Sequence, residues 1–219
     1  MSRKPTIIAP SVFACDFSRI GEEIIRTEKA GADWFHIDIM DGHFVDNFSF
    51  GPAVTESIAK VTAKPLDVHL MTEKPDHFFL RFRPFARNIT FHLEAPCDTS
   101  GTARAIRKSG CTVGLAISPP TPFAKVEPFL SQIDLLLVMT VNPGFGGQAF
   151  IAEMMEKVRA AKGIREEHGY DFHIEVDGGI GPDTAQVATE AGANVLVAGT
   201  AVFRSEDPTK AIAELRGVE

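Results

Sequence analysis

Three short apolar segments of this chain carry histidine and acidic residues at alternating positions. They read FHIDIMDGHF, with His36 and Asp38, PLDVHLM, with His69, and HIEVDGG, with Asp177. Because successive side chains of a β-strand point to opposite faces, the alternating residues of each segment would share one face. If these segments are parallel strands of one barrel, two imidazoles and two carboxylates meet where the strands end.

The four side chains have the chemistry of a divalent-metal site. Nitrogen and carboxylate ligands without a thiolate suit Zn²⁺, with Fe²⁺, Mn²⁺ or Co²⁺ as alternatives. Any one of these residues alone is better explained as a hydrogen-bonded core histidine or a turn-forming aspartate. Four of them at matching strand ends favour the metal site. Asp67 and Glu175 lie deeper on the same faces, where they either orient the imidazoles or are charges at the bottom of the strands.

The carboxylates of Asp38 and Asp177 also suggest a paired general base and general acid. Three methionines, Met40, Met71 and Met139, occupy equivalent strand positions. They would form an apolar floor over the reacting carbon, although ordinary core filling explains each of them equally well.

Glycine-rich turns follow three late segments of the chain. They read NPGFGG (142–147), DGGIGPD (177–183) and AGTAVF (198–203), and each precedes a helix or a helical turn. Glycine lets backbone N–H groups approach an anion, and a helix N-terminus favours negative charge. Three such turns on one rim predict a phosphate site.

Strand-like and helix-like segments alternate along the whole chain. We expect strands at 6–9, 34–38, 66–70, 88–92, 112–117, 135–139, 172–176 and 195–198. We expect helices at 17–29, 52–60, 75–85, 102–109, 122–130, 152–168, 182–191 and 208–216. Eight units of about 27 residues favour a single (β/α)₈ TIM barrel over residues 1–219. A doubly wound open sheet is the rival fold, but its nucleotide-binding motif, GFGGQA, would follow the sixth strand rather than the first.

Composition narrows the range of partners. The 219 residues carry 22 Lys and Arg against 29 Asp and Glu, a net charge of −7, which disfavours nucleic-acid and anionic-membrane partners. Cys15, Cys97 and Cys111 are odd in number and widely spaced, so we expect a reducing cytoplasmic location and no disulfide scaffold. No signal peptide or transmembrane segment is readable.

Taken together, six segments strongly resemble the ribulose-phosphate 3-epimerase family: PSVFACDF, FHIDIMDGHFV, PLDVHLM, VMTVNPGFGGQAF, IEVDGGIGPD and VAGTAVF. The resemblance implies a metal-dependent epimerase of D-ribulose 5-phosphate and D-xylulose 5-phosphate that works through a cis-enediolate. It assigns one divalent ion to His36, Asp38, His69 and Asp177. In the ribulose-to-xylulose direction Asp38 would accept the proton and Asp177 would donate one.

The resemblance also assigns the substrate contacts. These are Ser11, Gly144, Phe145, Gly146, Gly147, Gly178, Gly179, Gly199 and Thr200. From their strand positions we also expect His69 and the three methionines to contact the substrate. Family members associate as dimers or hexamers, so we expect a homo-oligomer. The activity would serve pentose phosphate metabolism or carbon fixation.

Three departures from the family pattern stand out. Asp46 replaces a usual proline in HFVDN, Ser118-Pro119-Pro120 stands where Asn-Pro or Lys-Pro is common, and Thr200 replaces a frequent serine. The first bears on the rigidity of the loop over the site. Alternatives are an epimerase of a related ketose phosphate, such as D-allulose 6-phosphate, and a non-catalytic sugar-phosphate-binding barrel. A Schiff-base aldolase would need a strand-end lysine, whereas Lys64, for instance, precedes its strand.

Overall fold

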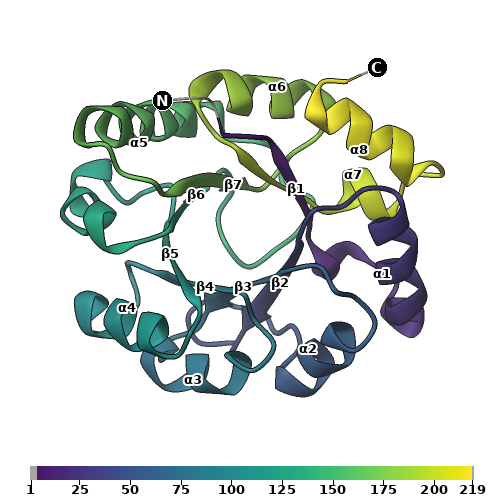
Figure 1. Cartoon of the computed structure of the whole chain (residues 1–219), viewed down its shortest axis with the longest axis horizontal. Helices are drawn as coiled ribbons and strands as arrows, with labels where there is room; N and C mark the ends of the chain where they lie inside the picture. Colours follow the sequence, from purple (N-terminus) through teal and green to yellow (C-terminus); the bar gives the residue numbers. More distant parts are fainter. Residues whose placement is uncertain (1–3, 219) are drawn as a thin grey trace.

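Eight parallel strands form the centre of the molecule, and helices surround them (Figure 1). The computed structural model describes residues 4–218. The strands are β1 (Ile7–Pro10), β2 (Phe35–Met40), β3 (Leu66–Met71), β4 (Asn88–His92), β5 (Thr112–Ile117), β6 (Leu135–Met139), β7 (His173–Asp177) and β8 (Val195–Ala198). Neighbours in sequence pair from β2 to β8, and β8 pairs with β1. A single bridge between Ser11 and His36 joins β1 to β2, which confirms the predicted TIM barrel.

The helices lie outside the barrel. They are α1 (Ile20–Lys29), α2 (Pro52–Ala59), α3 (Pro75–Phe82), α4 (Thr99–Lys108), α5 (Met155–His168), α6 (Pro182–Ala191), α7 (Thr200–Phe203) and α8 (Pro208–Arg216). Proline opens four of them, where its missing N–H costs no hydrogen bond. Asp98 and Asp207 cap α4 and α8, because their side chains accept hydrogen bonds from backbone N–H groups of the first helical turn. None of the helices described between residues 4 and 218 is long and apolar enough to cross a bilayer.

The predicted helix at 122–130 is wrong. Two short 3₁₀ segments, Phe123–Lys125 and Glu127–Gln132, connect β5 to β6 instead. Pro128 explains the difference, because proline lacks the N–H that a continuous α-helix requires and disfavours helical geometry in the residue before it. The predicted helices at 17–29 and 152–168 likewise begin with a 3₁₀ turn.

Alternate residues of each strand divide between two environments. Side chains such as Ile37, Ile39 and Val68 join the helices in one large apolar cluster. The intervening residues form the inside of the barrel, where the register sets His36 beside Asp67 and Asp38 beside His69. Strands β6 and β8 place leucine and valine there instead. The polar interior positions therefore lie on β2, β3, β4 and β7, and the apolar positions of β6 and β8 flank β7.

Substitutions at two glycines, one inside the barrel and one on the helix surface, can test how tightly each region is packed. Gly114 of β5 pairs with Thr90, and a Cβ added to it would lie 3.0 Å from the Thr90 Cα. We expect Gly114→Ala to destabilise the fold by about 1–3 kcal/mol through overpacking. Gly163, exposed within α5, has open space, so Gly163→Ala should stabilise by about 1 kcal/mol through helix propensity. Equilibrium urea unfolding measures the change in the free energy of unfolding for each variant. Equal changes would contradict the placement of Gly114 in the packed interior and Gly163 on the open surface.

Candidate active site

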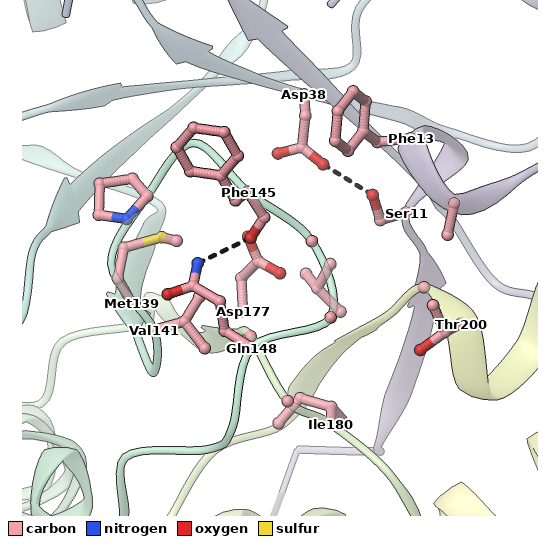
Figure 2. Close-up of a pocket in the computed structure, with 18 of the residues that line it drawn as sticks. Ser11, Phe13, Asp38, Met139, Val141, Phe145, Gln148, Asp177, Ile180 and Thr200 are labelled. Carbon is pink, nitrogen blue, oxygen red and sulfur yellow. Dashed lines mark hydrogen bonds between the residues drawn. The ribbon is translucent and has the colours of Figure 1, made fainter. Parts of the chain in front are cut away.

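A cavity of about 710 Å³ opens at the carboxyl ends of the strands. Figure 2 shows Asp38 and Asp177 pointing into it, with Met139 at one side and Thr200 toward α7. The lining includes these predicted residues: Ser11, Asp38, Met40, Met71, Met139, Gly144, Phe145, Gly146, Gly147, Asp177, Gly178, Gly179, Gly199 and Thr200. His36 and His69 are fully buried beneath it.

The four predicted metal ligands converge. His36 Nε2 lies 3.2 Å from Asp38 Oδ1 and 3.3 Å from His69 Nδ1. Asp177 Oδ2 lies 4.0 Å from His36 Nε2. Ligand atoms around a tetrahedral ion with bonds near 2.1 Å stand roughly 3.4 Å apart, so these separations and donor types fit one divalent ion.

The two carboxylates differ in their electrostatics. Burial alone would raise the pKa of Asp38, but the charge of His36 and hydrogen bonds from His36 and His69 hold it well below its usual range. Burial, and then the negative charge of Asp38, raise the pKa of Asp177 to about 7. Without a cation, Asp38 is therefore ionised at neutral pH while Asp177 is poised to carry a proton.

Asp67 and Glu175 lie one layer deeper. His36 Nδ1 donates to Asp67 Oδ2 over 2.8 Å, and Asn88 Nδ2 donates to Asp67 Oδ1 over 2.7 Å. This geometry supports the orienting role for Asp67. Glu175 Oε1 lies 3.6 Å from His36 Nδ1, and neither Glu175 oxygen has a hydrogen-bond partner within residues 4–218. Burial and the charge of Asp67 raise the Glu175 pKa well above its usual range, which favours a neutral carboxyl.

Ser11 follows β1, where the barrel closes against β2, and it contacts the Asp38 carboxylate. Its hydroxyl donates to Asp38 Oδ2 over 2.7 Å (Figure 2). This bond and the contact of Asp38 Oδ1 with His69 Nδ1, at 3.0 Å, engage both oxygens of Asp38 and define its orientation. Met40 and Met71 pack together and line the cavity.

The glycine turns also line the cavity. Gly178 and Gly179 have φ of +119° and +67°, in the left-handed region that disfavours other residues. A Cβ on Gly179 would lie 2.6 Å from the Phe150 backbone nitrogen, so the turn tolerates only glycine. Asn47 Nδ2 donates to the Gly144 carbonyl over 2.7 Å and ties a second turn to the loop after β2.

Several cavity residues were not predicted from the sequence: Phe13, Gln148, Ile180 and Arg204. Among the described residues that line the cavity, Arg204 has the only cationic side chain, and it follows α7 directly. The sequence signal was an arginine five residues beyond the Gly199 turn. His92 and Glu94, in FHLEA, were also missed, although they repeat the alternation of the other polar strands.

Known proteins are similar to this sequence over nearly its whole length. Residues 7–203 match the sequence model of the Ribulose-phosphate 3 epimerase family. The chain belongs to the ribulose-phosphate 3-epimerase family. A ribulose-phosphate 3-epimerase of Bacillus subtilis is 46% identical over 212 residues, covering 96% of this chain and 98% of its own. The chloroplastic enzyme of Arabidopsis thaliana is 40% identical, covering 96% and 76%.

Family membership makes the protein an isomerase acting on carbohydrates. Solved structures with low identity share its fold. The tryptophan synthase α-subunit of Pyrococcus furiosus aligns with a TM-score of 0.73 at 13% identity, over all of both chains. A 3-hexulose-6-phosphate synthase aligns with a TM-score of 0.64 at 18% identity, also over both whole chains.

Proposed function

We propose that the protein interconverts D-ribulose 5-phosphate and D-xylulose 5-phosphate by exchanging the proton at C3. The observation that carries this proposal is the placement of Asp38 and Asp177 in one cavity, from strands β2 and β7. Strands β1 and β8 separate them around the barrel. Two carboxylates on different strands can serve opposite faces of a planar enediolate.

Inversion at C3 requires removal of a proton from one face and delivery to the other. In the ribulose-to-xylulose direction, Asp38 accepts the proton and Asp177 returns one. The low pKa of Asp38, set by the neighbouring histidines against the effect of burial, and the pKa of Asp177 near 7 support these roles. General acid–base catalysis contributes about 10²–10⁴-fold, so it needs electrostatic help for so weak a carbon acid.

That help is assigned to one divalent ion held by His36, Asp38, His69 and Asp177. When bound, such an ion acts as a Lewis acid that stabilises negative charge on the C2 and C3 oxygens. Zn²⁺ is the first candidate, and Fe²⁺, Mn²⁺ and Co²⁺ suit the same ligands. Ser11 holds the Asp38 carboxylate, and the methionine floor keeps water from the reacting carbon.

The phosphate end is assigned to the glycine turns and Arg204. The turns at 144–147, 178–179 and 199–200 present backbone N–H groups to an anion, and Arg204 adds a positive charge beside them. Binding the phosphate positions C3 between the carboxylates. Our proposal further includes one domain over residues 1–219, a dimer or hexamer, and a cytoplasmic location.

Metal affinity should depend on pH. The raised pKa of Asp177, near 7, means that an incoming ion must displace a proton at pH 6 but not at pH 8. His36, whose pKa its carboxylate neighbours raise against the effect of burial, adds to the same trend. We expect Co²⁺ affinity, measured against a competing chelator, to fall at least about tenfold from pH 8 to pH 6.

The His69→Ala variant is the control for this measurement, because it loses one of the four ligands and should bind Co²⁺ weakly at both pH values. Exhaustive chelation should abolish turnover of the wild type, and restored ion should recover it. Full activity in metal-free protein would contradict the assignment.

Isotope exchange should separate the roles of the two carboxylates. In D₂O, Asp177→Asn should exchange the C3 hydrogen of ribulose 5-phosphate while forming little xylulose 5-phosphate, because Asp38 still removes the proton. Asp38→Asn should behave in the mirror sense with xylulose 5-phosphate. NMR of the recovered sugars measures both, in variants shown to retain metal. Epimerisation by either variant near the wild-type rate would exclude two fixed bases.

Substrate preference should follow the phosphate contacts. We expect unphosphorylated ribulose to be a very poor substrate, and allulose 6-phosphate to be turned over less efficiently than ribulose 5-phosphate. Arg204→Ala should raise KM about tenfold with little change in kcat, and Arg204→Lys should recover part of it. Lys210→Ala, on exposed α8, is the matched control. Sugar-phosphate binding without turnover would instead indicate a binding protein.

A further inference from the structure

A line of polar side chains leads away from His69 on the side opposite Asp38. His69 Nε2 lies 2.9 Å from His92 Nε2, and His92 Nδ1 lies 3.1 Å from Glu94 Oε2. The ring centres of His69 and His92 lie 5.0 Å apart, and the Phe44 ring packs against His92 with its centre 4.8 Å away. His92 is fully buried, so these contacts define its position.

Hydrogen-bond donors and acceptors along this line admit one arrangement when an ion is bound. His69 Nδ1 faces Asp38 Oδ1 at 3.0 Å, on the side of the candidate metal site. A metal takes the lone pair of the nitrogen that it binds, so the ring proton of His69 must sit on Nε2. That proton can only be donated to an unprotonated His92 Nε2. The proton of His92 then lies on Nδ1 and is donated to Glu94.

Glu94 is itself held by the turn after β5. The Ser118 N–H donates to Glu94 Oε1 over 2.8 Å, and the Thr121 hydroxyl donates to the same oxygen. The Ser118 hydroxyl also lies 3.4 Å from His92 Nδ1, as a weaker second neighbour. Hydrogen bonds from His92 and Thr121 outweigh the effect of burial and lower the pKa of Glu94 to about 2, so an ionised acceptor faces His92.

The turn has its own support from the helix layer. Lys157 of α5 donates to the carbonyls of Ser118, Pro119 and Thr121 over 3.1, 2.8 and 2.7 Å. This turn contains the Ser118-Pro119-Pro120 segment that departs from the usual family pattern. Prolines at 119 and 120 restrict its backbone, and the lysine adds a charged donor to three of its carbonyls.

We propose that His92 and Glu94 are positioning residues that fix which nitrogen of His69 faces the metal site, with the 118–121 turn holding Glu94 in place. This inference rests on the metal site of the proposed function. Neither residue needs to touch the substrate. Without His92 as acceptor, His69 is free to carry its proton on Nδ1, which competes with the ion. Loss of such a partner weakens metal binding by about 10- to 100-fold.

Matched substitutions at His92 separate the hydrogen bond from packing. His92→Phe keeps a planar ring but accepts no proton from His69, and we expect Co²⁺ affinity of the full chain to fall about 10- to 100-fold. His92→Gln offers an acceptor to His69 and a donor to Glu94, so it should recover most of the affinity. Glu94→Gln should cause an intermediate loss. His173→Phe, at the other end of the barrel beside Trp34 and Asn194, should leave affinity unchanged.

The proton positions can be read in the wild type itself, without dependence on a variant that folds. In Zn²⁺-loaded protein labelled with ¹⁵N-histidine, NMR should show His69 protonated at Nε2 and His92 protonated at Nδ1. Zinc bound through Nε2 of His69, or equal Co²⁺ affinity of the wild type and His92→Phe, overturns this inference and leaves the metal site intact. A wild type that binds no divalent ion overturns both.

Discussion

The interior of this barrel depends on a buried histidine held between two buried carboxylates. His36 lies 2.8 Å from Asp67 on one side and 3.2 Å from Asp38 on the other. Isolated charges at this depth would cost several kcal/mol each, so each member is stable only because the others are present. The same attraction lowers the pKa of Asp38 despite burial and leaves Asp177 with its pKa raised. The chemical difference between the two cavity carboxylates therefore begins with His36.

Apolar packing between the strands and the outer helices offsets the free-energy cost of burying these polar groups. The residues that face the helices are apolar in every strand, so the large hydrophobic cluster forms independently of the site. The interior can then carry histidine, aspartate and asparagine on β2, β3 and β4 while β6 and β8 remain apolar. The polar side chains of the site come from β2, β3 and β7, and the apolar layer outside the barrel supplies the packing.

Much of the fold was predictable because its signals are local. Strands at 88–92, 112–117, 135–139 and 195–198 have the predicted bounds, since short apolar or β-branched runs between turn residues mark them directly. The convergence of His36, Asp38, His69 and Asp177 followed from strand parity once a barrel was assumed. Pro128 was the overlooked local signal where a helix was wrongly expected. His92 and Glu94 were missed because their role depends on contacts with His69 and the turn after β5, which the sequence does not display. Arg204 was missed because only the folded chain brings the end of α7 to the cavity. The opposite pKa shifts of Asp38 and Asp177 likewise depend on neighbours from other strands.

The barrel's seam has a consequence for synthesis of the chain. Strand β1 pairs fully with β8, whereas a single bridge from Ser11 to His36 joins it to β2. Residues 7–10 must therefore wait for residues 195–198 before their ladder can form, and Asp177 also emerges late from the ribosome. Until then, the acidic and imidazole groups of β2 and β3 have no closed interior around them. Closure of the sheet and completion of the cavity are one late event, so a truncated chain lacking β8 would lack both.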